Sequence, residues 1–127
     1  MSYKVLIVDD SKLARMAIAK ALVALHPDWT RIEAPSADDA LQVIESTPVD
    51  LALLDYNMPG RDGLAFAAEL RARHATMPLA IISANHQKEV VAQAHRLGAA
   101  FLPKPLSEQA LGEFLELAVQ RLKTGAT

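Results

Sequence analysis

The stretch Val5-Leu6-Ile7-Val8-Asp9-Asp10 decides how this chain folds, because four consecutive apolar residues run directly into two carboxylates. Three later stretches repeat this pattern of an apolar run that ends in a polar side chain: Leu51-Ala52-Leu53-Leu54 before Asp55, Leu79-Ala80-Ile81-Ile82 before Ser83, and Phe101-Leu102-Pro103 before Lys104. Short continuous apolar runs are typical of strands that are covered on both faces, as in parallel sheets. If these runs are parallel strands of one sheet, their polar ends gather at one edge, where open α/β sheets bind ligands.

Helix-like segments alternate with the strand-like ones along the whole chain. Ser11 and Ser107 are expected N-caps, Gly98 is an expected left-handed C-terminal cap, and residues 59–63 are expected to form a turn. The predicted strands are Lys4–Val8, Trp29–Ala34, Asp50–Leu54, Pro78–Ile82 and Ala99–Leu102. The predicted helices are Lys12–Leu25, a segment from 36 or 37 to about 46, Leu64–His74, His86–Leu97, and a last helix from Ser107 to about Leu122.

This alternation predicts an α/β fold, a doubly wound five-stranded parallel sheet with helices on both faces. We favour the strand order 2-1-3-4-5, the flavodoxin-like one of the two common doubly wound orders. That order places the first and third strands side by side, so Asp9, Asp10 and Asp55 share one pocket.

Composition limits the classes of protein that remain. The 127 residues favour a single domain, 1–127, and a hydrophobic content of 51% is enough to bury both faces of a sheet. The net charge of -2 provides no general basic field for nucleic acid, and the absence of cysteine excludes disulfides, thiolate catalysis and Cys-ligated zinc. No apolar stretch approaches the roughly 20 residues of a membrane span. We expect a cytoplasmic protein.

The clustered carboxylates predict a metal site. Two unit charges about 4 Å apart repel by on the order of 4 kcal/mol at an effective dielectric constant near 20, so the cluster needs a cation or a raised pKa. Oxygen ligands without His or Cys suit Mg²⁺, which keeps several waters and takes phosphate oxygens as further ligands. The site is therefore expected to accept a phosphoryl group.

The residues around this pocket suit phosphoryl transfer. An aspartate can attack phosphorus to form an acyl phosphate, and Asp55 follows the central strand. Lys104 would neutralise one phosphoryl oxygen and the Ser83 hydroxyl would donate to another, which is the positioning that phosphoryl transfer requires. Lys104 precedes Pro105, and X–Pro bonds are the usual site of cis peptides; a cis bond there would be one way to aim the ammonium inward.

Taken together, these residues resemble the receiver domain of two-component response regulators over nearly the full length of the chain. The matching features are Asp9-Asp10, the phosphoacceptor position Asp55, the segment from Asp55 to Gly63, the hydroxyl position Ser83 and the pair Lys104-Pro105. The resemblance implies that Asn57 offers its main-chain carbonyl to Mg²⁺, beside Asp9, Asp10 and Asp55. It also implies that Ser83 and Phe101 are switch residues; Phe101 stands where many members have Tyr, and Ser83 replaces the commoner Thr.

The function implied by this resemblance is a phosphorylation-controlled switch. A histidine kinase or phosphotransfer protein would phosphorylate Asp55, and the face of helix four, strand five and helix five would change its preference among downstream protein targets. The chain resembles single-domain regulators of the chemotaxis type. We therefore expect no output domain, no direct nucleic acid or membrane partner, a monomer or weak dimer, and no enzymatic activity beyond its own phosphorylation and dephosphorylation. The alternative is a receiver excised from a larger response regulator or hybrid kinase.

Other interpretations of the same residues stay open at this point. A phosphatase resembling the haloacid dehalogenases would need a second Asp where Asn57 stands, a flavin carrier would be repelled by Asp9-Asp10, and a degenerate receiver would bind partners without phosphorylation. Taken singly, the acidic pair suits a helix N-terminus, Ser83 a helix cap, Lys104 a solvated surface and Phe101 a plain core. We expect Arg71 and Arg73 to lie on a solvated helix face.

Overall fold

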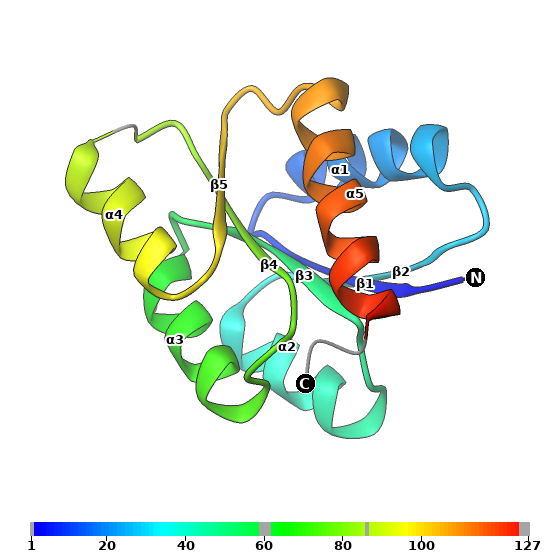
Figure 1. Ribbon diagram of the computed structural model, residues 1–127, viewed down its shortest axis with the longest axis horizontal. Helices are drawn as coiled ribbons and strands as arrows, with labels where there is room; N and C mark the ends of the chain where they lie inside the picture. Colours follow the sequence, from blue (N-terminus) through cyan, green and yellow to red (C-terminus); the bar gives the residue numbers. More distant parts are fainter. Residues whose placement is uncertain (1, 59–61, 86, 125–127) are drawn as a thin grey trace.

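The computed structural model describes residues 2–58, 62–85 and 87–124, and in this part of the chain five strands alternate with five helices (Figure 1). The strands are β1 Lys4–Val8, β2 Thr30–Ala34, β3 Leu51–Asp55, β4 Leu79–Ser83 and β5 Ala100–Pro103. The helices are α1 Lys12–Leu25, α2 Ala37–Ser46, α3 Gly63–Arg73, α4 Lys88–Arg96 and α5 Glu108–Lys123.

The strands form one parallel sheet in the order β2-β1-β3-β4-β5, which confirms the predicted fold class and topology. The register aligns the carboxyl ends of the strands: Val8 lies between Ala34 and Leu54, and Asp55 lies opposite Ile82. The polar residues that end the apolar runs are therefore neighbours along one edge.

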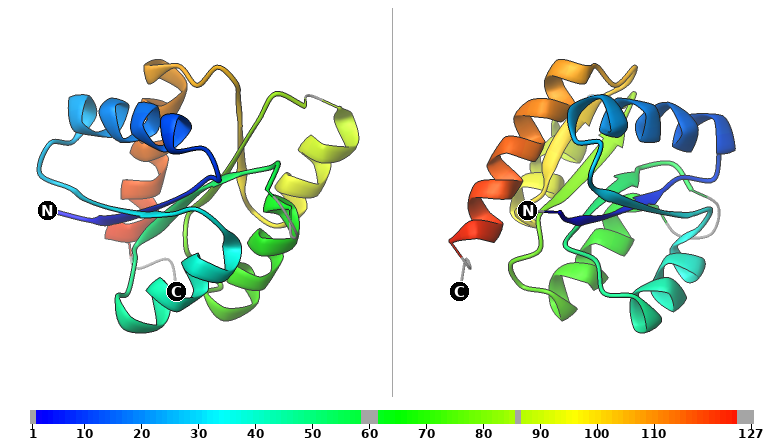
Figure 2. Two further views of the ribbon diagram at one scale, coloured as in Figure 1. Left: turned by 180° about the vertical axis from the view of Figure 1, so that it is seen from behind. Right: turned by 90° about the vertical axis from the view of Figure 1, so that its right-hand side faces the viewer.

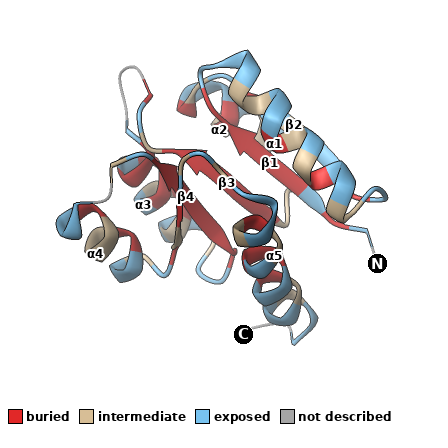
Figure 3. Cartoon of the chain, turned by 90° about the horizontal axis from the view of Figure 1, so that it is seen from above, coloured by how far each residue is buried: buried red, intermediate tan, exposed pale blue. Residues whose placement is uncertain are grey.

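Helices cover both faces of the sheet, because alternate strand residues point to opposite sides. Leu6 and Val8 belong to the core cluster under α2, α3 and α4, whereas Val5 and Ile7 belong to the cluster under α1 and α5. Figure 2 shows these two layers, and Figure 3 shows the central strands buried beneath helices whose outer sides are exposed. Within the described residues, no helix is both long and apolar enough to cross a membrane.

β2 begins at Thr30, one residue later than predicted. The predicted bounds were also wrong by one residue at both ends of β3, β4 and β5, and this second error has a structural meaning. Each of these strands begins one residue later than predicted and includes one further residue, Asp55, Ser83 or Pro103. Strand pairing continues beyond the apolar runs, since Asp55 pairs with Ile82 and the Tyr56 N–H donates to the Ile82 carbonyl. Asp55 and Ser83 are thus held by the sheet itself.

Helix ends follow local chemistry. The Ser11 and Ser107 side chains accept from main-chain N–H groups as expected, and Gly98 has a φ of 68° at the end of α4. Asp62 is an N-cap that the sequence analysis did not identify, and it starts α3 at Gly63 rather than Leu64. Residues 59–61 of the expected turn and the expected helix start at His86 lie outside the described residues.

Gly63 allows α3 to begin directly against the end of β3. Its N–H donates to the Tyr56 carbonyl at 2.8 Å. A Cβ at this position would collide with the Asp55 carbonyl oxygen and would lie 2.9 Å from Tyr56 Cα. The backbone that carries Asp55 therefore depends on the absence of a side chain at residue 63.

We expect Gly63→Ala to lower the free energy of unfolding by about 1–3 kcal/mol, because the added methyl group overpacks against main-chain atoms that cannot move aside cheaply. Urea denaturation followed by circular dichroism measures this. Gly112→Ala is the matched control: its Cβ would meet Leu25 at an ordinary 3.7 Å, and alanine favours a helix by about 1 kcal/mol over glycine. Equal effects of the two substitutions would contradict the close approach at Gly63.

Candidate functional site

The central contact of the site is an ion pair between Lys104 and Asp55. Lys104 Nζ lies 2.7 Å from Asp55 Oδ1, and the Asp55 side chain is only 4% exposed. β4 separates β3 from β5, and neighbouring strands lie about 4.8 Å apart, so only a long side chain reaches from the end of β5 to Asp55. The Lys104 N–H donates to the Ser83 carbonyl at 3.0 Å, which fixes the base of that side chain. The Lys104–Pro105 peptide bond is cis.

Asp9, Asp10 and Asp55 form the predicted acidic cluster. One ligand oxygen from each of the three residues lies within 4.8 Å of the others. Asp9 Oδ1 accepts from the Ser11 N–H at 2.9 Å, whereas Asp9 Oδ2 is buried and has no hydrogen-bond partner among the described residues. Asp10 is exposed. A buried carboxylate oxygen without a donor, in an all-oxygen set, fits a hard divalent cation.

Burial is the main reason that the pKa of Asp9 is raised above its ordinary value. The nearby carboxylates of Asp55 and Asp10 raise this pKa further, while the Ser11 N–H and the Lys104 ammonium oppose the shift. The order of these effects means that desolvation and mutual repulsion outweigh the donors that the chain supplies. The positive charge of Lys104 is therefore too small to offset the negative charge of the three carboxylates.

Arg15 is a site residue that the sequence analysis missed. From α1, its Nη1 donates to the Asp9 carbonyl at 2.6 Å and its Nε pairs with Glu33 Oε1 at 3.0 Å. The Asp9 N–H donates to the Ala34 carbonyl, so Arg15 joins the ends of β1 and β2 beneath the acidic pair. The sequence could have indicated Arg15 as a site residue, because it lies one helical turn after the Ser11 cap and so on the side of α1 near Asp9.

The structure places the predicted switch residues at different depths. Ser83 is buried at the sheet edge, and its Oγ accepts from the Asn85 N–H at 2.8 Å, which leaves the hydroxyl proton for another acceptor. Phe101 pairs with Ile81 two residues before the end of β5 and packs, half-buried, against the core that α3 and α4 cover. Asn57 is exposed after β3, and its role as a metal ligand stays a prediction.

An apolar groove of about 550 Å³ opens beside the charged cluster. Asp9 and Lys104 line its polar end. Small and branched apolar residues line the rest, from α1, from the end of β4 and from the segment before α5: Ala14, Ala17, Ile18, Ala21, Ile82, Ala84, Pro105 and Leu106. A partner with a complementary apolar surface could therefore rest against α1 while reaching the carboxylates.

Comparison of sequences connects this site with a known family. The family model of the response regulator receiver domain matches residues 5–116. The positive alginate biosynthesis regulatory protein of Pseudomonas aeruginosa is 41% identical over 118 residues, 90% of this chain and 46% of that protein. The glycerol metabolism activator of Pseudomonas putida is 37% identical over 116 residues, 90% of this chain and 52% of that protein. The chain thus spans about half the length of these relatives.

Solved structures show the same architecture. NtrX of Brucella abortus matches with a TM-score of 0.87 and 30% identity, over 99% of this chain and 29% of that one. The chemotaxis protein CheY4 of Vibrio cholerae matches with a TM-score of 0.83 over 93% of this chain and 99% of that one. At 24% identity, this second likeness is one of fold alone.

We expect Asp9→Asn to raise the melting temperature of the metal-free protein at pH 7. Because the pKa of Asp9 is raised in the folded protein, protonated Asp9 stabilises the fold. This stabilisation is fully present below the ordinary pKa of 3.8 and is lost as the pH rises through the pKa of the folded state. The advantage of Asn should therefore shrink as the pH falls toward 3.8, as thermal unfolding across this range measures. Asp28→Asn, at an exposed position, is the control. A pH-independent difference between Asp9→Asn and the wild type would rule out this explanation.

Proposed function

The chain belongs to the response regulator receiver family, and on this premise we propose that it is a phosphorylation-controlled signalling switch with Asp55 as its phosphoacceptor. Receiver domains are signalling modules rather than catalytic enzymes. The observation that carries the proposal is the 2.7 Å contact between Lys104 Nζ and Asp55 Oδ1 beside the carboxylates of Asp9 and Asp10. An ammonium held against one aspartate of an acidic cluster is the arrangement that a transferred phosphoryl group requires.

The proposed step is a transfer from phosphohistidine. An Asp55 carboxylate oxygen attacks phosphorus, the new O–P bond forms as the N–P bond breaks, and the electron pair returns to the imidazole of the donor. Lys104 then pairs with a phosphoryl oxygen in place of the free carboxylate. The Ser83 hydroxyl donates a hydrogen bond to a second phosphoryl oxygen. Phe101 turns inward behind Ser83 as the switch residue that reports this change to α4, β5 and α5.

The donor set of the site supports Mg²⁺ as the metal that the family uses. Asp9, Asp10, Asp55 and the main-chain carbonyl of Asn57 are the proposed ligands, and the unpartnered Oδ2 of Asp9 is the buried atom with most need of a cation. When bound, Mg²⁺ supplies positive charge that offsets the repulsion between the carboxylates and an incoming phosphoryl group.

The phosphodonor is a histidine kinase or phosphotransfer protein, and the apolar groove beside Lys104 supports docking of such a protein. The output is a changed preference of the α4–β5–α5 face for protein targets, through a shift between conformations that the phosphoryl group stabilises differently. A second candidate is a receiver module of a larger regulator or hybrid kinase. The curated relatives, about twice as long as the matched region, favour it.

We expect Mg²⁺ to raise the melting temperature, because it binds the folded cluster and not the unfolded chain. At a concentration ten times the Kd, the stabilisation is about 1.4 kcal/mol. Differential scanning fluorimetry at constant ionic strength measures the shift. Asp10→Asn should reduce it without loss of fold, since Asp10 is exposed, and Asp28→Asn should retain it. No shift of the wild type at millimolar Mg²⁺ would refute the metal site.

Intact-protein mass spectrometry tests the phosphoacceptor. Incubation with acetyl phosphate and Mg²⁺ should add the mass of one phosphoryl group to the wild type and to Asp28→Asn, and nothing to Asp55→Asn. A degenerate receiver, which binds partners without phosphorylation, would gain no mass in any variant. Mass gained by Asp55→Asn would place the phosphoacceptor elsewhere.

A further inference from the structure

Arg71 is only partly exposed, whereas the sequence analysis placed it with Arg73 on a solvated helix face. Arg73 is half exposed and pairs with Glu69 one turn earlier. The Arg71 guanidinium instead makes five hydrogen-bond contacts within the described residues, and in all of them it donates to main-chain carbonyl oxygens. A planar fork with five N–H donors suits this use, and no other side chain could replace it fully.

The five acceptors come from two segments that lie far apart in the sequence. Nε and Nη2 donate to the carbonyls of Leu97 and Gly98, at 2.7 and 3.2 Å. Nη1 contacts the carbonyls of His74, Ala75 and Met77, at 3.3, 3.0 and 2.7 Å. We call Arg71 with these five carbonyl groups the arginine clamp. The clamp connects the end of α4 with the segment between α3 and β4. The helices α3 and α4 lie side by side in Figures 1 and 2.

The clamp completes the C-terminal cap of α4. The Gly98 N–H donates to the His95 carbonyl and the Ala99 N–H to the Ala94 carbonyl, which is the hydrogen-bond pattern of a Schellman motif. That motif satisfies carbonyls inside the helix but not those of Leu97 and Gly98, which point onward. Arg71 binds both of these carbonyls.

Among the described residues, the opposite end of α4 has no side-chain cap. Its N-cap, Gln87, makes no side-chain hydrogen bond to the helix, and the Gln87 N–H itself donates to Asn85 Oδ1 at 3.1 Å. Asn85 in turn donates through its N–H to the Ser83 hydroxyl, at the edge of the acidic site. The N-terminal end of α4 is therefore connected to the proposed switch residue, while the C-terminal end is fixed to α3.

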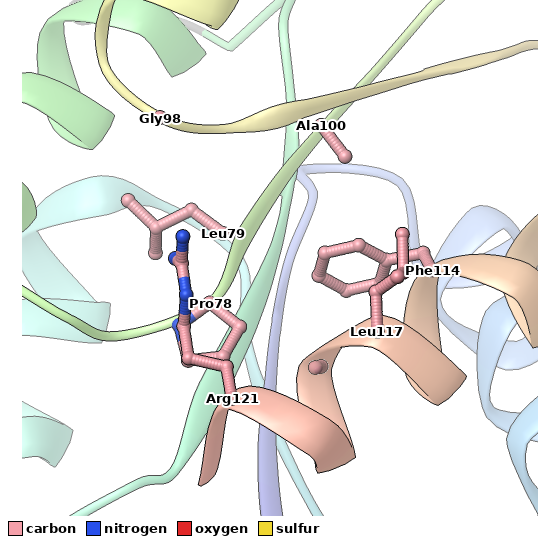
Figure 4. A pocket seen from close by; sticks show the side chains of 8 residues that line it. Pro78, Leu79, Gly98, Ala100, Phe114, Leu117 and Arg121 are labelled. Carbon is pink, nitrogen blue, oxygen red and sulfur yellow. The ribbon is translucent and has the colours of Figure 1, made fainter. Parts of the chain in front are cut away.

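Among the described residues, Arg71 is held by hydrogen bonds to main-chain carbonyls and not by a carboxylate. Burial, and to a smaller extent the Arg121 guanidinium, lowers the pKa of Arg71 from its usual value. Figure 4 shows Arg121 extending from α5 beside Pro78 and Leu79, with Gly98 across the pocket. A partly buried cation next to a second cation is held in place by the carbonyl groups that accept from it.

We propose that Arg71 is a positioning residue that makes the C-terminal end of α4 a fixed pivot, so that α4 opens and moves from its N-terminal end beside Ser83. This inference deepens the proposed function, because it states how a change at Ser83 is turned into movement of one end of α4. The moving end would alter the exposed side of α4, whereas β5 would start from a fixed point at Ala99. Resting and phosphorylated chains should differ in the first turn of α4 and not in its last turn.

Amide hydrogen exchange of the resting protein tests the clamp. In the wild type, the amides of Leu97, Gly98 and Ala99 should exchange more slowly than that of Val91, whose N–H bonds to the Gln87 carbonyl. Arg71→Gln should speed exchange at 97–99 by about tenfold, because hydrogen bonds from a charged donor typically contribute about that factor. Arg71→Lys keeps the charge but not the fork, and should recover only part of the protection.

Arg73→Gln is the matched control, with the same change two residues along the same helix, and exchange at 97–99 should not respond to it. Measurements at low urea concentrations separate local opening, which has little urea dependence, from general loss of stability, which would accelerate all amides alike. Equal exchange at Val91 and at 97–99 in the wild type, or equal effects of Arg71→Gln and Arg73→Gln, would overturn the proposal.

Phosphorylated protein tests the pivot separately from the phosphoacceptor. After acetyl phosphate and Mg²⁺ treatment, with phosphoryl incorporation followed by mass, exchange should change at Val91 but stay at the resting level at 97–99. In Arg71→Gln both regions should change. A change at 97–99 as large as that at Val91 in the phosphorylated wild type would refute the pivot. If no mass is gained, the proposed function fails, and the resting-state comparison still decides the clamp.

Discussion

Repulsion among three carboxylates at one edge of the sheet is the constraint on which the rest of this structure depends. Asp9 and Asp55 are buried, so water does not screen their charges, and the Lys104 ammonium offsets only part of the repulsion. The remaining negative charge, with one buried oxygen unpartnered, makes the site receptive to a divalent cation. In the proposed function, that same excess charge is what links metal binding to phosphoryl transfer.

A scaffold that holds such charges together must be stiff, and the sheet provides this stiffness. Asp55 is itself a strand residue, paired with Ile82 of β4, and α3 starts against it because residue 63 has no side chain. Arg15 joins the ends of β1 and β2 below Asp9. The groove along α1 remains open, so the rigid cluster is accessible from one side.

The opposite side of the molecule combines fixed and weakly held parts. Ser83 and Asn85 connect the acidic site with the start of α4, where the cap is weak, and Arg71 fixes the end of the same helix through main-chain carbonyls. A helix held at one end responds to a change at its other end by tilting rather than by sliding. That geometry would send the signal toward the surface that α4 and β5 share.

The sequence by itself determined the fold class and the acidic, hydroxyl and lysine positions, because these follow from apolar runs, caps and the rule that parallel strands end at one edge. It favoured the strand order only as one of two common doubly wound orders, and the folded sheet decided between them. Tertiary structure decided which long side chains are used and where. Lys104 reaches across β4 to Asp55, Arg15 binds beneath Asp9, and Arg71 is drawn inward while Arg73 stays in solvent. Local patterns treat neighbouring arginines alike, since their acceptors belong to segments that only the folded chain brings near.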